Sequence, residues 1–194
     1  GVSELIGVDE AGRGPLAGPV VAAAVLMCNA PCPDLAAVAD SKVLTEEQRE
    51  ALYEPITRRA RAFSVCCVHP RAIDKLNILA ATLSGMRRAV KKLNSGALVL
   101  IDGNSHVKGL RQPQLSIIDG DAMSFSIACA SIVAKVTRDR LMVKLDRRYP
   151  GYGLAIHKGY ATLAHRRALR LLGPSPIHRR SFKPVAAAVS AASA

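Results

Sequence analysis

Short apolar runs predict five β-strands. Residues 5–8 form a continuous apolar run, and residues 20–27 form a longer one rich in valine and alanine, as is typical of strands buried in a core. Three further runs predict strands at residues 63–68, 97–101 and 115–118, with 97–101 as the clearest buried strand.

Helical periodicity predicts most of the remaining elements. Apolar residues recur at three- and four-residue spacing over 70–93 and over 124–148, which predicts two long helices with one face on the core. A shorter helix carrying three arginines is predicted over 162–172. These elements predict a single α/β domain with a mixed central sheet, helices on both sides and a small helical C-terminal region.

One helix start is marked by its capping residues. Thr45 is a good N-cap and Gln48 follows three residues later, which is the capping-box pattern. The helix is expected to run to about Arg59, and Pro55 is a position where it could end early or kink.

Carboxylates follow two of the predicted strands. Asp9 and Glu10 come directly after the first strand, and Asp102 follows the strand at 97–101. Buried acids are costly unless a cation neutralises them, and hard divalent ions such as Mg²⁺ take carboxylate oxygens. The alternative is that each acid lies in a solvated turn. Acids at the ends of two separate core strands make the turn explanation insufficient.

A turn rich in glycine and proline follows the first two acids. Gly12 and Gly14 flank Arg13, so another molecule can approach the backbone closely beside a cation. The spacing does not fit a dinucleotide-binding fingerprint, because prolines interrupt it and a strand follows. No Gly-Lys-Ser/Thr follows either, which excludes a phosphate-binding loop of that type.

The charge of the chain is unevenly distributed. The 194 residues carry a formal net charge of +12, yet residues 1–134 hold 14 Lys/Arg against 13 Asp/Glu, a balance of +1. Residues 135–194 hold 13 Lys/Arg against 2 Asp, a balance of +11. This asymmetry favours a phosphate-backbone partner, with a merely basic surface as the alternative.

Cysteines and histidines provide little support for a metal centre of their own. The five cysteines form no C-x-x-C pair, so reduced thiols and a cytoplasmic location are expected. His157, His165 and His178 lack the spacing of a metal site, and satisfied or solvated histidines are expected. The longest uncharged segment is broken by glycine, asparagine and prolines, so no membrane span or membrane partner is predicted.

The segment Val8-Asp9-Glu10-Ala11-Gly12-Arg13-Gly14-Pro15-Leu16-Ala17-Gly18-Pro19-Val20 resembles the N-terminal signature of the bacterial ribonuclease HII family, the type 2 ribonucleases H. The resemblance continues over nearly the whole chain, at Asp40-Ser41-Lys42, Asn77-Ile78-Leu79-Ala80-Ala81-Thr82, Ala130-Ser131-Ile132-Val133-Ala134-Lys135-Val136-Thr137-Arg138-Asp139 and His157-Lys158-Gly159-Tyr160-Ala161-Thr162.

The resemblance implies a ribonuclease H-like fold and a metal-dependent endoribonuclease. It implies hydrolysis of the RNA strand of RNA–DNA hybrids, and incision 5′ of single ribonucleotides embedded in duplex DNA, leaving 3′-hydroxyl and 5′-phosphate ends, as in ribonucleotide excision repair. Two Mg²⁺ or Mn²⁺ ions would be held by four carboxylates: Asp9, Glu10, Asp102 and Asp121. The family usually has Lys-Gly-Asp where this chain has Asp119-Gly120-Asp121, which leaves open whether Asp119 helps to hold a metal or only raises neighbouring pKa values.

The resemblance also implies residues that bind substrate. Main-chain groups of Gly12, Arg13 and Gly14 would reach the 2′-hydroxyl, and Lys42 would meet a phosphate, unless it is an ordinary surface lysine. Tyr160 would stack on the sugar of the next deoxynucleotide, unless it is a half-buried packing residue.

The predicted organisation is one catalytic domain over residues 1–184, followed by an Ala-rich tail over 185–194 that is either a short helix or disordered. A monomer is expected, with RNA–DNA hybrid and ribonucleotide-containing DNA duplex as its partners. Two alternatives remain: another carboxylate-metal nuclease, such as an exonuclease, resolvase or integrase, and a non-catalytic duplex-binding module.

Overall fold

The computed structural model describes residues 3–28, 33–40 and 44–192 and contains one five-stranded mixed sheet. The strand order is β3-β2-β1-β4-β5. The first strand pairs antiparallel with the second and parallel with the fourth, so the sheet changes from antiparallel to parallel at β1. The strands are β1 (Glu4–Ala11), β2 (Val20–Cys28), β3 (Ala62–Val68), β4 (Leu98–Asp102) and β5 (Gln114–Ile117).

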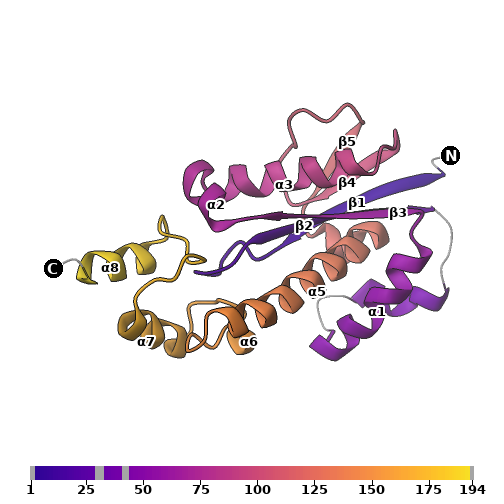
Figure 1. Cartoon of the computed structure of the whole chain (residues 1–194). Helices are drawn as coiled ribbons and strands as arrows, with labels where there is room; N and C mark the ends of the chain where they lie inside the picture. The colour runs from indigo at the N-terminus through magenta and orange to yellow at the C-terminus, as the bar shows by residue number, and fades with distance from the viewer. Residues whose placement is uncertain (1–2, 29–32, 41–43, 193–194) are drawn as a thin grey trace.

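Helices cover both faces of this sheet (Figure 1). One face carries α2 (Pro70–Leu76) and α3 (Ile78–Lys92), and the other carries α5 (Phe125–Arg148), with α1 (Glu46–Arg59) and the 3₁₀ segment η1 (Pro33–Asp40) beside it. The remaining helices are α4 (Gly120–Met123), α6 (Leu154–His157), α7 (Leu163–Leu172) and α8 (Lys183–Ala192). The predicted fold class, with five strands, helices on both faces and a helical C-terminal region, is confirmed.

The two sides of β2 are split between two cores. Ala22 and Ala24 pack toward α3, whereas Ala23 and Val25 pack toward α5, as strand alternation requires. All four are fully buried. A strand lined by small residues lets both helices approach the sheet closely.

The long helix predicted over 70–93 is broken into α2 and α3 at Asn77, so that prediction is wrong. Asn77 has φ +70° and ψ 165°, outside helical values, and its side chain accepts a hydrogen bond from the N–H of Ala80. It therefore ends one helix and caps the next. The apolar spacing continues across the break, which is why periodicity alone did not show it.

Elsewhere the structure refines the predicted boundaries. The capping box at Thr45 is present, and α1 continues through Pro55 to Arg59 without ending early. The short helices α4 and α6 were not predicted. For the C-terminal tail, the structure shows a helix: Val185 of α8 is fully buried and packs with Leu16 and Leu169.

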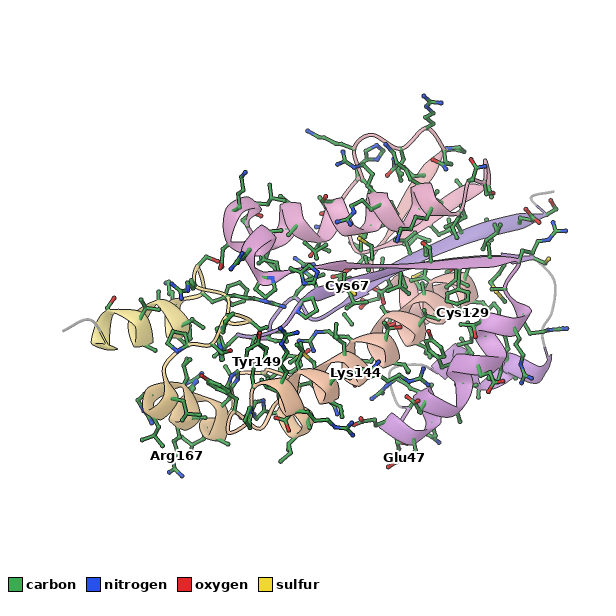
Figure 2. All side chains as sticks on the ribbon, viewed as in Figure 1. Glu47, Cys67, Cys129, Lys144, Tyr149 and Arg167 are labelled. Atoms are coloured by element: carbon green, nitrogen blue, oxygen red, sulfur yellow. The ribbon has the colours of Figure 1, made fainter. Side chains whose placement is uncertain are left out.

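Four cysteines in the described residues are not disulfide-bonded, and burial raises the pKa of the Cys67 thiol. Figure 2 shows Cys67 on β3 and Cys129 on the neighbouring helix α5, among the packed side chains. None of the helices in the described segments is long and apolar enough to pass through a bilayer.

Candidate active site

Three of the predicted carboxylates lie at the carboxyl edge of the parallel pair β1 and β4. Asp9 and Glu10 are near the end of β1, and Asp102 is the last residue of β4. In the parallel register Val8 lies opposite Ile101, so Asp9 and Asp102 are the next residues on the two neighbouring strands. Ligand sites gather at such strand ends in α/β proteins.

Burial and the neighbouring acids raise the pKa values of Asp9 and Glu10. Asp9 is only 6% exposed, and burial raises the pKa of its carboxyl well above the ordinary range, with Glu10 and Asp102 raising it further. Hydrogen bonds from the Ser131 side chain and from the Glu10 N–H, at 2.6 Å, oppose that shift. Burial also raises the pKa of Glu10; Arg13 opposes it from 3.4 Å and Asp102 adds to it.

The fourth predicted carboxylate comes from α4. The N–H of Gly120 donates to Asp102 Oδ1 at 2.8 Å, which ties the start of this short helix to the end of β4. Asp121, one residue further, lines a cavity of about 290 Å³ together with Glu10, Gly12 and Tyr160. Asp119 precedes α4 in the left-handed conformation and is exposed.

The chemistry of these side chains fits hard divalent cations, because all four offer carboxylate oxygens and the buried Asp9 carries a charge that its neighbours oppose. Their arrangement is open, however. Within the described residues no three Asp, Glu, His or Cys side chains are grouped so as to hold an ion as they stand. Asp9 and Glu10 are successive strand residues, whose side chains alternate between faces. Ion binding would therefore have to bring the carboxylates closer together.

The glycine turn is held against the site by a buried arginine. Gly12 has φ +94°, and a Cβ on it would lie 1.9 Å from Arg138 Nε, so only glycine fits there. Arg138 donates to the carbonyls of Pro19 and Ala17, at 3.1 and 3.3 Å. Burial lowers the pKa of its guanidinium, whose hydrogen-bond partners are these backbone carbonyls.

Tyr160 lies next to this turn and is 47% exposed. A Cβ on Gly14 would lie 3.7 Å from Tyr160 Cε1. The structure therefore brings together the predicted turn, Tyr160 and the acids. Lys42 lies outside the described residues.

Sequence reasoning missed several residues that line or support the cavity. Ser131, Lys135 and Arg138 come from one side of α5, and Arg49 comes from α1. Lys135 pairs with Asp139 at 2.7 Å. The signal was available: polar residues recur at helical spacing in a helix that is otherwise mostly buried.

The three C-terminal histidines form a cluster rather than separate sites. His157 and His165 are stacked with ring centroids 4.5 Å apart, and His165 Nε2 lies 3.0 Å from His178 Nε2. His165 and His178 are buried, and burial lowers the pKa of both rings, that of His178 to about 4. They are the satisfied histidines that were expected.

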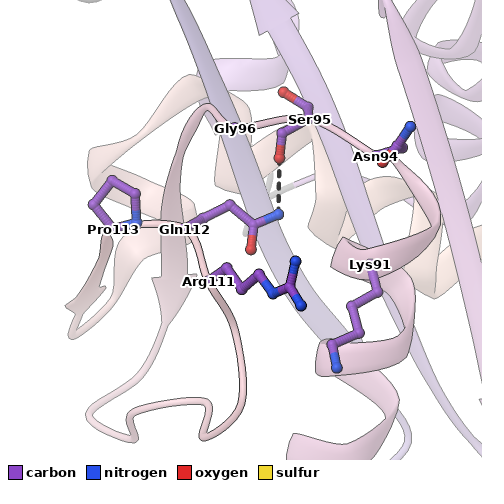
Figure 3. A pocket seen from close by; sticks show the side chains of 7 residues that line it. All are labelled: Lys91, Asn94, Ser95, Gly96, Arg111, Gln112 and Pro113. Atoms are coloured by element: carbon purple, nitrogen blue, oxygen red, sulfur yellow. Dashed lines mark hydrogen bonds between the residues drawn. The ribbon is translucent and has the colours of Figure 1, made fainter.

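A larger cavity, of about 580 Å³, lies at the opposite end of the sheet, between the end of α3 and the start of β4 (Figure 3). Lys91 and Arg111 line it, and Gln112 Nε2 donates to the Ser95 carbonyl at 2.8 Å. Its described lining has no carboxylate, histidine or cysteine, whereas the smaller cavity is lined by Glu10 and Asp121.

A mixed five-stranded sheet flanked by helices, with acids at adjoining strand ends, is typical of the ribonuclease H-like fold class. The family model of ribonuclease HII matches residues 6–185. A ribonuclease HII of Rhodococcus opacus is 49% identical over 187 residues, which cover 96% of this chain and 83% of the relative. The chain belongs to the ribonuclease HII family and is accordingly a ribonuclease, an enzyme of the hydrolase class.

Solved structures agree with this assignment. The ribonuclease H2 of Pyrococcus horikoshii OT3 matches with a TM-score of 0.83 and 26% identity, covering 97% of this chain and 98% of that one. Bst-RNase HIII, solved in complex with Mn²⁺, has the same fold, with a TM-score of 0.81 at 20% identity over 99% of this chain and 71% of its own.

Proposed function

We propose that this ribonuclease cleaves the RNA strand of RNA–DNA hybrids and also incises duplex DNA on the 5′ side of a single embedded ribonucleotide. The observation that carries the proposal is the meeting of Asp9, Glu10 and Asp102 at one sheet edge, beside the Gly12–Gly14 turn and Tyr160. The family membership supports hydrolysis of hybrids. The turn and the tyrosine support the finer specificity.

Asp9, Glu10, Asp102 and Asp121 would hold two Mg²⁺ or Mn²⁺ ions. When bound, such ions acidify water and neutralise the charge that develops on the reacting phosphate. The chain itself supplies few other groups for proton transfer at this edge. Its part is to bind the duplex, orient the scissile phosphate toward the acids and select the sugar.

The turn selects the sugar through its backbone. Arg179 donates to the carbonyls of Gly12, at 2.6 Å, and Arg13, at 2.8 Å. These hydrogen bonds fix the backbone of the turn, so that its main-chain groups can be presented to a 2′-hydroxyl in one orientation. That hydroxyl distinguishes RNA from DNA at a given position.

The duplex would be held by the exposed cations of the C-terminal third. Arg166, Arg167 and Arg170 are all exposed on α7. Figure 2 shows Arg167 on the outer side of that helix, away from the sheet. Contacts of this kind bind phosphates without reading sequence, so their contribution should weaken as salt rises.

A labelled DNA duplex with one ribonucleotide tests the proposal, in Mg²⁺ or Mn²⁺, beside an all-DNA duplex and a uniform hybrid. We expect cutting of the ribonucleotide strand and of the hybrid only, leaving a 3′-hydroxyl, with both activities lost in Asp102→Asn. Cutting of the all-DNA duplex would indicate a general carboxylate-metal nuclease. Tight binding without turnover would indicate a binding module.

Replacing Tyr160 should separate sugar selection from duplex binding. We expect Tyr160→Ala to lower kcat/KM on the single-ribonucleotide duplex by about 10- to 100-fold, in line with the loss of one stacking contact, and to change duplex affinity much less. Tyr160→Phe keeps the ring and should retain most activity. Equal losses of cleavage and binding in Tyr160→Ala would contradict this role.

A further inference from the structure

Two adjacent buried side chains, His178 and Arg179, connect the elements that would contact substrate. They are 2% and 0% exposed and lie in an irregular segment after α7. The backbone of this segment runs along the glycine turn: the N–H of Gly18 donates to the Ile177 carbonyl at 2.9 Å, and the N–H of Arg179 donates to the Leu16 carbonyl at 2.8 Å.

Arg179 holds both ends of the loop formed by residues 12–18, which contains the Gly12–Gly14 turn. Its two terminal nitrogens donate to the carbonyls of Gly12 and Arg13, and Nε donates to the carbonyl of Gly18 at 3.0 Å. Burial, together with the neighbouring Arg138, lowers the pKa of Arg179 to about 9. Burying a cation is costly, and here the guanidinium serves as a planar set of donors that fixes three carbonyls at once.

His178 reaches the loop of Tyr160 through His165. The N–H of Ser175 donates to His178 Nδ1 at 3.1 Å, so that nitrogen is an acceptor and the neutral ring carries its proton on Nε2. His178 Nε2 therefore donates to His165 Nε2, 3.0 Å away. His165 in turn carries its proton on Nδ1 and donates to the Tyr160 carbonyl at 2.8 Å.

The donor and acceptor roles in this chain of hydrogen bonds hold only while both histidine rings are neutral. A second proton on His178 would displace the Ser175 N–H, and one on His165 would oppose the His178 N–H. The side chains facing the pair are the Ser175 hydroxyl, 2.9 Å from His178 Nδ1 and able to donate to it, His157, stacked on His165, and Tyr152, whose ring centroid is 4.8 Å from that of His178. The lowered pKa values of both rings keep them neutral at neutral pH.

We propose that His178 and Arg179 are positioning residues that set the spacing between the Gly12–Gly14 turn and Tyr160, and thereby the preference for a ribonucleotide followed by a deoxyribonucleotide. Neither residue needs to touch substrate. One side chain fixes the element that would meet the 2′-hydroxyl, and its neighbour fixes the element that would meet the next sugar. The inference rests on the proposed function, because it assigns both elements their roles in sugar selection.

The test measures the ratio of kcat/KM on the single-ribonucleotide duplex to kcat/KM on a uniform hybrid. Arg179→Lys keeps a cation but cannot hold three carbonyls, and we expect it to lower the ratio about tenfold. Arg58→Lys, at an exposed position of α1 outside the C-terminal third, is the matched control and should leave the ratio unchanged. Thermal unfolding of each variant shows that it is folded under assay conditions.

A pair of substitutions at His178 separates positioning from packing. In His178→Gln the amide nitrogen can take the place of Nε2 and donate to His165, whereas in His178→Asn it cannot reach. We expect the glutamine variant to retain the ratio and the asparagine variant to lose about tenfold. Equal losses on both substrates, or equal ratios in the two variants, would overturn the inference. A wild-type enzyme that shows no preference for the single-ribonucleotide duplex would instead overturn the junction selectivity of the proposed function.

Discussion

Asp9→Asn should abolish cleavage and at the same time make the protein more stable. Loss of one of the carboxylates that would hold the metal ions should lower kcat/KM on either substrate by about 10³-fold or more, because metal ions supply several kcal/mol of charge stabilisation in the transition state. The amide has nearly the same shape, and its oxygen can still accept from the Glu10 N–H. It removes a charge that burial, Glu10 and Asp102 all disfavour.

The gain in stability should depend on pH in a defined direction. The pKa of Asp9 is raised in the folded protein above its ordinary 3.8, so folding is penalised once the unfolded chain loses that proton. The penalty is absent below about pH 3.8, increases with pH, and becomes constant above the folded pKa. Asp9→Asn should therefore increase the free energy of unfolding by about 1–2 kcal/mol at neutral pH, and by little under acidic conditions.

Urea unfolding at several pH values, with and without added Mn²⁺, measures both effects. Mn²⁺ should stabilise the wild type more than Asp9→Asn, because an ion offsets the same charge repulsion. Glu54→Gln is the control: that exposed glutamate pairs with Arg58 at 3.6 Å, and its loss should change stability by less than about 0.5 kcal/mol. Destabilisation by Asp9→Asn at neutral pH would show that the site does not hold uncompensated charge.

The placement of the acids at one sheet edge was predictable because it depends on local order along the chain. Asp9, Glu10 and Asp102 each follow an apolar run, and strand ends in a mixed sheet meet at an edge. The helix break at Asn77 was not predictable from the same kind of pattern. It depends on one residue adopting φ +70° while the apolar spacing continues on both sides.

The hydrogen-bond partners of the supporting residues could not be identified from the sequence, because these partners lie far along the chain. Arg179 bonds carbonyls more than 160 residues away, and Ser131 bonds Asp9 from the opposite layer. Their role also changes how the net charge is interpreted. Arg138 and Arg179 belong to the basic C-terminal third, yet both are buried on backbone carbonyls, so they do not contribute to an exposed phosphate-binding surface.

Gly7→Ala, which adds a single methyl group, should strongly destabilise the fold. Gly7 lies in β1 where α5 crosses the sheet, and a Cβ there would be 1.9 Å from the Ser126 carbonyl oxygen and 2.4 Å from the Ile127 nitrogen. These are backbone atoms, which cannot rotate away as a side chain can. The helix would have to move off the central strand, at a cost of at least about 3 kcal/mol.

The effect should extend from folding to activity, because α5 also carries Ser131 against Asp9. Circular dichroism during thermal unfolding measures the first effect, and cleavage at a temperature where the variant is still folded measures the second. Gly96→Ala is the matched control, since a Cβ at Gly96 meets nothing within 4 Å and its φ is not positive. The control should be neutral or more stable by up to about 1 kcal/mol, through the unfolded state. If Gly7→Ala melted like Gly96→Ala, the close approach of α5 to β1 would be wrong.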